Sequence, residues 1–137
     1  MEEFIISETT KIFSKAINRF AKNEKQNPLN TSFLLSIGED EEKKVEYQLC
    51  FEHQPVKKIS IMEVLGVKID LKGYSLLVPP QIKKIIENFA LELGSNKVEV
   101  SIYLDREDEN QVMYFLYNDG HLVKRFELQD VLKLELA

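Results

Sequence analysis

Two stretches of the chain have the apolar spacing of an amphipathic helix. In residues 8–25 apolar side chains recur every three or four positions, and Ser7 is placed to cap the helix start. In residues 79–93 a similar run follows Pro79-Pro80, which suit a helix start, and stops at Gly94, which suits a helix end. The pattern therefore predicts two helices.

Apolar and polar residues alternate in further stretches, as they do in strands that bury one face. Six of them follow the two helices in groups of three: 32–37, 45–51, 56–62, 98–104, 112–118 and 122–128. Asp119-Gly120 is typical of a two-residue hairpin turn. Short strands are also predicted ahead of each helix, at Phe4–Ser7 (alternatively a helix lead-in) and Ser75–Val78. Each half is predicted to end in a tail, Val67–Leu71 in the first half and Val131–Leu136 in the second. The tail Val67–Leu71 is predicted to be a strand that follows a short helical turn.

The two halves of the chain are similar in sequence. Phe13–Ala21 aligns without gaps on Ile82–Ala90 with four identities in nine positions, and Val45–Ile69 aligns on Val112–Leu136 with seven in twenty-five. Random pairing gives about one identity in sixteen. The alternative is two unrelated hairpin units of similar composition. We predict an α+β fold of internally duplicated β-α-β-β-β units, about 4–71 and 74–137, in a single domain (1–137), with a mainly antiparallel sheet and two helices packed on one face.

Composition narrows the class of protein. The chain has 137 residues, of which 44% are hydrophobic and 30% charged, an ordinary globular balance. It contains no apolar run of membrane-spanning length, its first residues do not form a signal peptide, and it has one cysteine. We therefore expect a cytoplasmic protein without a membrane partner. The net charge of −5 argues weakly against a dedicated nucleic-acid binder.

The sequence offers little catalytic chemistry. His53 and His121 lie in hairpin turns without a second ligand at metal spacing, and the acidic runs 39–42 and 106–109 lack the spacing of a calcium loop. Cys50 faces away from the inward residues of its strand and is expected to be an inert thiol. The glycines are scattered singly, so no phosphate-binding loop is present. We expect no enzyme activity, no metal and no cofactor.

One face of the first helix is basic. At 100° per residue, five basic side chains fall within about 120° of one another, and this basic stripe consists of Lys11, Lys15, Arg19, Lys22 and Lys25. The polar face of the second helix mixes lysines with glutamates, so the fold does not require a basic face. The stripe is a candidate site for phosphates or an acidic partner. The alternative is an ordinary solvated helix face.

A second candidate site consists of large residues expected on the sheet face away from the helices. This apolar patch consists of Tyr103, Met113, Phe115 and Tyr117, whereas the matching positions of the strand 45–51 are mostly polar. Burying each such side chain is worth about 1.5–3 kcal/mol. A partner, a second subunit or the chain's own segments should therefore cover the patch.

Residues 75–87, Ser-Leu-Leu-Val-Pro-Pro-Gln-Ile-Lys-Lys-Ile-Ile-Glu, resemble the strand, polar break and helix that open a repeat of a DNA sliding clamp. Phe4–Ile6 followed by Lys11–Ala16 resembles the same opening more loosely. The duplicated unit as a whole is similar in topology to one clamp domain. This resemblance implies helices that line a hole, basic residues that face DNA and an outer sheet surface that binds partners.

Three functional hypotheses follow. The first is a non-enzymatic, clamp-like binding module that acts through a protein or nucleic-acid interface, with the basic stripe toward an anion and the apolar patch toward a protein. The second is a small acidic chaperone or adaptor that dimerises and binds a client protein through the patch. The third is a small-molecule binder with a cleft between the two halves. A protein partner or self-association is expected, and nucleic acid is a further candidate.

Overall fold

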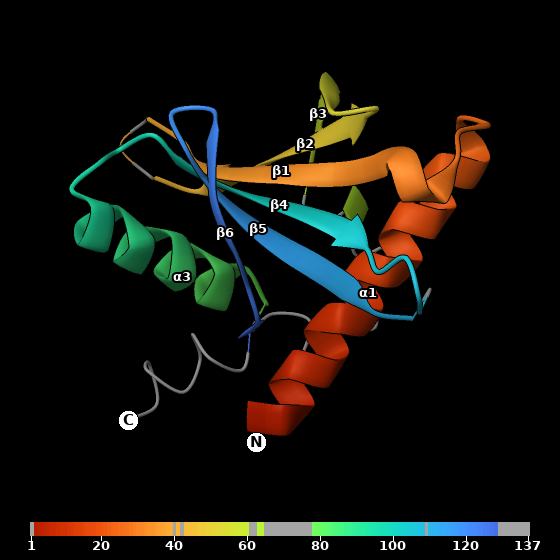
Figure 1. Cartoon of the computed structure of the whole chain (residues 1–137), viewed down its shortest axis with the longest axis horizontal. Helices are drawn as coiled ribbons and strands as arrows, with labels where there is room; N and C mark the ends of the chain where they lie inside the picture. Colours follow the sequence, from red (N-terminus) through yellow and green to blue (C-terminus); the bar gives the residue numbers. More distant parts are fainter. Residues whose placement is uncertain are drawn as a thin grey trace.

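The computed structural model describes residues 2–39, 41, 43–60, 63–64, 78–108 and 110–128. In order along the chain, the elements are α1 (Glu2–Asn23), the short 3₁₀ turn η1 (Pro28–Asn30), β1 (Thr31–Ile37), β2 (Val45–Phe51), β3 (Gln54–Ile59), α3 (Val78–Leu93), β4 (Val98–Leu104), β5 (Val112–Asn118) and β6 (His121–Phe126). In the described part of the chain, a helix is thus followed twice by three strands (Figure 1).

The described strands form one antiparallel sheet in the order β3-β2-β1-β4-β5-β6. Each set of three consecutive strands is connected by hairpins, and the two sets meet where β1 pairs with β4. In that central pairing Leu34 lies opposite Ser101, and Phe33 lies opposite Ile102. The antiparallel sheet expected from the hairpin-rich sequence is confirmed.

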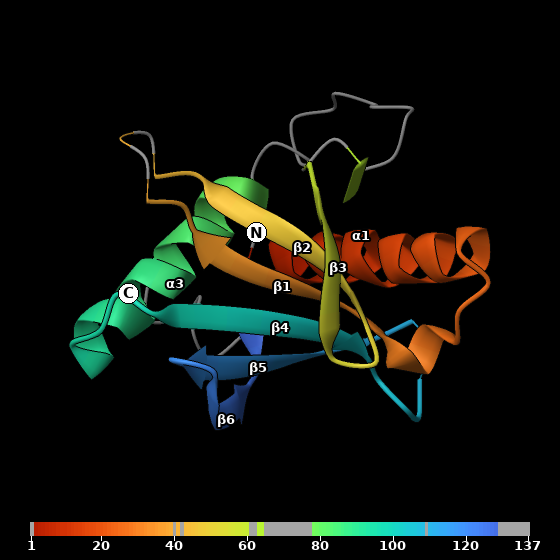
Figure 2. The same ribbon diagram turned by 90° about the horizontal axis from the view of Figure 1, so that it is seen from above.

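Both helices pack against the same face of the sheet (Figures 1 and 2). Their apolar stripes and the inward residues of the strands form one core cluster, which includes Phe13, Ile17, Phe33, Leu49, Ile85, Ile86, Ile102 and Leu116. The ring of Phe33 contacts those of Phe13 and Phe20, with centroids 6.1 and 5.8 Å apart. The predicted α+β fold with both helices on one face is confirmed. The opposite sheet face, which neither α1 nor α3 covers, is called the helix-free face below.

The two halves match element by element. The strands β4, β5 and β6 begin and end 67 positions after β1, β2 and β3, and irregularities follow Leu49 in β2 and Leu116 in β5 at the same offset. Leu34 and Ser101, which pair at the centre of the sheet, are separated by the same 67 positions. Antiparallel pairing of equivalent residues relates the halves by a local twofold axis. This arrangement is compatible with duplication, which itself stays a prediction.

The ends of the two helices are also alike. Both helices are followed by a residue in the left-handed region, Lys25 with φ 54° and Gly94 with φ 61°. After α3, the backbone N–H of Ser95 donates to the carbonyl of Ala90 at 3.0 Å, which satisfies a carbonyl at the helix end. The helix end predicted at Gly94 is confirmed.

Both helices begin earlier than predicted. Phe4–Ser7 is helical, which agrees with the helix lead-in alternative and not with a strand, and Ser7 is not an N-cap because α1 begins at Glu2. Ile5 lies seven positions before Ile12, so the helical period continues back through this stretch, and each residue added to a helix gains one hydrogen bond. Val78 is the first residue of α3 and not the last of a strand. The predictions for 75–77, 67–71 and 131–136 fall outside the described residues.

The strands β3 and β6 end three and two residues before their predicted ends. After β3, the hydroxyl oxygen of Ser60 accepts from the N–H of Glu63 at 3.1 Å, and the Glu63 carboxylate accepts from the N–H of Ser60 at 3.2 Å. This reciprocal capping box starts a helical turn at Glu63–Val64 and stops the strand. Val64 and Leu128 then bury their side chains in the core.

Candidate binding site on the helix-free face

The four residues of the predicted apolar patch lie together on the helix-free face. Tyr103 of β4 and Met113 of β5 are cross-strand partners, and Phe115 and Tyr117 follow Met113 at alternate positions of β5. Their neighbours along these strands, such as Ile102 and Tyr114, point into the core. All four patch side chains are half-buried. The strand alternation therefore placed the patch on the correct face.

The patch lines a concave site with a volume of about 550 Å³, which we call the aromatic hollow. Its walls come from both halves of the chain: η1 and the β2–β3 turn on one side, and the β4–β5 connection and β6 on the other. The lining comprises Tyr103, Met113, Phe115 and Tyr117 together with Leu29, Asn30, His53, Leu104, Asp105, Arg106, Glu107, Leu122 and Arg125. The lining mixes aromatic and aliphatic side chains with polar and charged ones, and hollows of this size hold a small ligand or a few side chains.

His53 connects the two halves across this hollow. Its Nδ1 lies 2.7 Å from the hydroxyl oxygen of Tyr103, and the two rings are 5.5 Å apart. His53 was not among the predicted site residues, and it lies exposed in the β2–β3 turn, as the sequence predicted. It occupies the left-handed region (φ 68°), where the corresponding turn has Gly120 (φ 79°). The sequence carried no signal for this contact, because the backbone angle of His53 and its distance from Tyr103 are known only from the structure.

The aromatic rings form a corner in the floor of the hollow. The rings of Tyr103 and Phe115 meet edge to face, with centroids 5.7 Å apart and an interplanar angle of 84°, a favourable geometry for an aromatic pair. Burial raises the pKa of the Tyr103 hydroxyl, and the hydroxyl of Ser32 beside it opposes this shift. The Tyr103 hydroxyl is therefore neutral at physiological pH and can act as the donor in its contact with His53 Nδ1.

The rim of the aromatic hollow carries charges of both signs. The guanidinium of Arg125 lies 3.9 Å from the Asp105 carboxylate and 3.5 Å from that of Glu127. Leu29 and Leu122 are exposed and add apolar surface to the lining. One of the two arginines of the lining, Arg125, thus has two carboxylates within ion-pair distance, and the second, Arg106, is exposed.

A second concave site of about 500 Å³ lies on the helix-free face and is called the charged hollow. Its lining includes Ser36, Glu46, Lys58, Lys97, Glu99 and Asp119. At an offset of 67 positions, Ser36, Glu46 and Lys58 correspond to Tyr103, Met113 and Arg125 of the aromatic hollow. The two hollows are therefore equivalent places in the two halves, and only their side chains differ.

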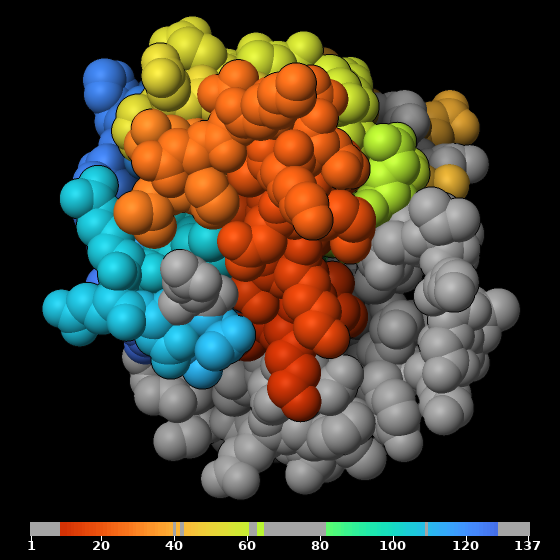
Figure 3. All heavy atoms as spheres, turned by 90° about the vertical axis from the view of Figure 1, so that its right-hand side faces the viewer, coloured from red at the N-terminus to blue at the C-terminus, as the bar shows by residue number. Residues whose placement is uncertain are grey.

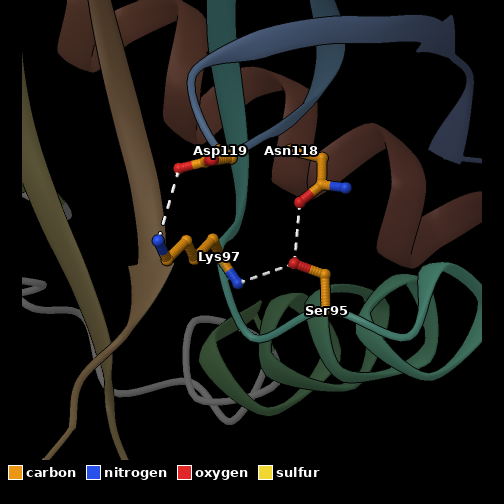
Figure 4. Close-up of polar contacts among 4 residues, drawn as sticks. All are labelled: Ser95, Lys97, Asn118 and Asp119. Atoms are coloured by element: carbon orange, nitrogen blue, oxygen red, sulfur yellow. Dashed lines mark hydrogen bonds and ion pairs between the residues drawn. The ribbon is translucent and has the colours of Figure 1, made fainter.

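A small polar network fixes one wall of the charged hollow (Figure 4). The Ser95 hydroxyl donates to the side-chain amide oxygen (Oδ1) of Asn118 at 2.7 Å and accepts from the backbone N–H of Lys97 at 3.1 Å. The ammonium of Lys97 lies 3.6 Å from the Asp119 carboxylate. These contacts join the segment after α3 to the β5–β6 turn.

Glu99 differs from Glu39, an exposed carboxylate of the charged hollow, in being partly withdrawn from water. It is half-buried, and it has no hydrogen-bond or ion-pair partner among the described residues. Burial raises the pKa of its carboxyl group. Its cross-strand partner is Tyr117, which belongs to the aromatic hollow, so Glu99 lies at the border between the two hollows.

Four residues of the basic stripe lie on α1, which runs through the middle of the view in Figure 3. The fifth, Lys25, lies beyond the helix, because α1 ends at Asn23 and not at Lys25 as predicted. Lys11, Lys15, Lys22 and Lys25 are exposed. Arg19 is half-buried, and its guanidinium donates to the backbone carbonyls of Glu63 at 2.5 Å and Val64 at 3.1 Å. Arg19 therefore holds the turn after β3 against α1, a role that helical periodicity did not reveal.

The remaining candidates for chemistry are few. Cys50 is buried, and burial raises the pKa of its thiol. Among the described residues, no group of three or more His, Cys, Asp or Glu side chains is arranged to hold a metal ion. No helix in the described segments is long and apolar enough to cross a membrane.

Comparisons with known protein families, with curated proteins and with solved structures find no match for this chain. The local geometry of the helix-free face and of α1 is therefore the basis for assigning a function.

Proposed function

We propose that this protein is a non-enzymatic binding module that holds a segment of a partner polypeptide on its helix-free face. The observation that carries the proposal is the convergence of Tyr103, Met113, Phe115 and Tyr117 with His53 around one hollow of about 550 Å³. Half-buried aromatic side chains around a concave site, with polar groups on its rim, are typical of interface anchors and their pockets.

The opposite half of the same face supports this proposal. Phe115 corresponds to Gln48 at the 67-residue offset, and both side chains are half-buried on the same sheet face. The backbone arrangement therefore does not require a large aromatic residue at Phe115. An aromatic ring at a position where the other half has an amide favours a binding role over a role in folding.

The matched pair Phe115→Ala and Gln48→Ala tests the proposal. Wild-type protein and both variants are immobilised and panned against a library of random twelve-residue peptides displayed on phage. We expect the wild type and Gln48→Ala to enrich a common motif with a large apolar residue, and Phe115→Ala to enrich none. The absence of enrichment on the wild type, or the same motif on Phe115→Ala, would contradict the proposal.

Light scattering distinguishes a partner from a second copy of the chain. A monomeric wild type is expected if the hollow receives another polypeptide. A dimer that Phe115→Glu dissociates while Gln48→Glu does not would instead assign the hollow to self-association, as in the chaperone or adaptor hypothesis. Circular dichroism of all three proteins establishes that the fold is retained.

The exposed lysines of α1 support a second candidate function, contact with nucleic acid as in the clamp-like hypothesis. Lys15 and Lys22 are exposed on the outer side of α1, which forms a continuous surface (Figure 3). Two phosphate contacts should give a salt-dependent affinity. Fluorescence anisotropy with a labelled 20-base-pair duplex compares the double variant K15Q/K22Q with K83Q/K84Q on α3. Equal affinities of the two double variants would rule out the stripe as the contact.

A further inference from the structure

Glu99 lies beside the aromatic hollow, and its carboxylate has no hydrogen-bond or ion-pair partner in the part of the chain that the structure describes. It projects from β4 between Val98 and Val100, which are buried in the core, so its own side chain lies on the helix-free face. It faces Tyr117 across the β4–β5 pairing. Burial raises the pKa of its carboxyl group, as expected for a carboxylate that is partly withdrawn from water without a nearby cation.

The cations that line the charged hollow already have partners. The ammonium of Lys58 lies 3.9 Å from the Glu46 carboxylate, and that of Lys97 lies 3.6 Å from the Asp119 carboxylate. The negative charge of Glu99 therefore remains uncompensated in the described structure. A half-buried carboxylate in this condition favours a ligand that brings a positive charge.

The aromatic rings beside Glu99 favour the same kind of ligand. The faces of tyrosine and phenylalanine rings attract ammonium and guanidinium groups, and Tyr103, Phe115 and Tyr117 line the adjoining hollow. The lining also holds two arginines, Arg106 and Arg125, and they are matched in number by the carboxylates Asp105 and Glu107. Asp105 and Glu127 are both within ion-pair distance of the Arg125 guanidinium. The net charge of −5 also steers cationic partners toward the protein.

We propose that the partner segment is basic and extended, with a large apolar side chain in the aromatic hollow and a nearby Lys or Arg side chain against Glu99 and Tyr117. This inference rests on the proposed function and adds the chemistry of the partner. Alternate residues of an extended chain point to the same side, roughly 7 Å apart. This spacing lets one short segment supply the apolar and the basic side chain to neighbouring parts of the face.

The substitution Glu99→Gln tests this inference, because it keeps the size and the hydrogen-bonding capacity of the side chain and removes its charge. The phage library is panned on wild type and on Glu99→Gln. We expect the wild type to enrich Lys or Arg within two positions of the apolar residue, and Glu99→Gln to keep the apolar preference and lose the basic one. Acidic or uncharged residues next to the apolar residue in the wild-type motif would overturn the inference.

Synthetic peptides measure the strength of the predicted preference for a basic residue. A fluorescein-labelled peptide with the wild-type motif is compared with one in which the basic residue is replaced by norleucine, using anisotropy at 50 and 300 mM salt. The wild type should bind the basic peptide about ten-fold more tightly at 50 mM salt, as expected for a charge-assisted contact. Glu99→Gln should bind the two peptides alike, whereas Glu46→Gln, whose carboxylate is already paired, should keep the preference.

The outcomes separate the two proposals. Both proposals are supported if Phe115→Ala loses all peptide binding and Glu99→Gln loses only the preference for the basic peptide. A preference for the basic peptide that persists in Glu99→Gln overturns the inference and leaves the binding module intact. If no peptide binds the wild type, the proposed function fails first, and the inference fails with it.

Discussion

The buried tyrosines Tyr47 and Tyr114 lead to a prediction about stability in alkali. They occupy equivalent positions on β2 and β5, and their side chains lie in the core under the helices. The hydroxyl of Tyr47 has no hydrogen-bond partner among the described residues. A buried polar group without a partner costs about 1–3 kcal/mol. We therefore expect Tyr47→Phe to leave stability at pH 7 unchanged or to raise it by about 1 kcal/mol.

The same burial makes stability depend on pH. Burial raises the pKa of Tyr47 and of Tyr114 far above the ordinary tyrosine value of about 10. Below pH 10 these groups are neutral in the folded and unfolded states, so their contribution to stability is fully present. Above pH 10 the unfolded chain loses their protons and the folded chain does not, so each tyrosine lowers the free energy of unfolding by about 1.4 kcal/mol per pH unit.

Urea denaturation followed by far-UV circular dichroism at pH 7 and between pH 10 and 11.5 measures this effect. Lysines also titrate in this range, so the informative quantity is the difference between the wild type and Tyr47→Phe. Its slope should be about 1.4 kcal/mol per pH unit, and the double variant with Tyr114→Phe should double it. A loss of more than 1 kcal/mol in Tyr47→Phe at pH 7, or an unchanged alkaline slope, would refute the reasoning.

Three further predictions concern the turns and the basic stripe. Arg19→Gln should lower the free energy of unfolding in urea by about 1.5–3 kcal/mol, because Arg19 bonds to two backbone carbonyls. The control Lys15→Gln should change this free energy by less than about 0.5 kcal/mol, and equal effects of the two substitutions would contradict this role of Arg19. His53→Gly should keep or raise the midpoint of thermal unfolding, because glycine adopts the φ of 68° at this position without strain. The same substitution should weaken peptide binding. A clear loss of stability would show that the histidine has a structural role. Gly120→Ala, at φ 79°, should cost about 1–2 kcal/mol in thermal unfolding, and an unchanged midpoint would show that the turn can change its conformation.

Much of the fold could be predicted from local pattern. The strands β2, β4 and β5 have the predicted bounds, because strict alternation between polar and apolar residues leaves one register in which the apolar side chains face the core. The turn at Asp119-Gly120 followed from residue types that tolerate positive φ. The pattern of Phe4–Ser7 left a strand and a helix lead-in open because its few residues fit both periods, and the structure has the helix.

Only part of the candidate site could be predicted from the sequence. Alternation placed Tyr103 and Phe115 on one sheet face, but it did not show that the face is hollowed there. The hollow also needs His53, which is fifty positions away from Tyr103 and reaches it only through the pairing of β1 with both β2 and β4.

The sequence by itself determined which residues face the core, which face solvent and where most chain reversals occur, because these depend on spacing and on local backbone preference. Only the tertiary structure decided which polar groups have partners. It placed Arg19 against two carbonyls from the other end of the first half and left Glu99 unpaired beside Tyr117. Such pairings depend on the positions of groups far apart in the chain, and local periodicity carries no information about them.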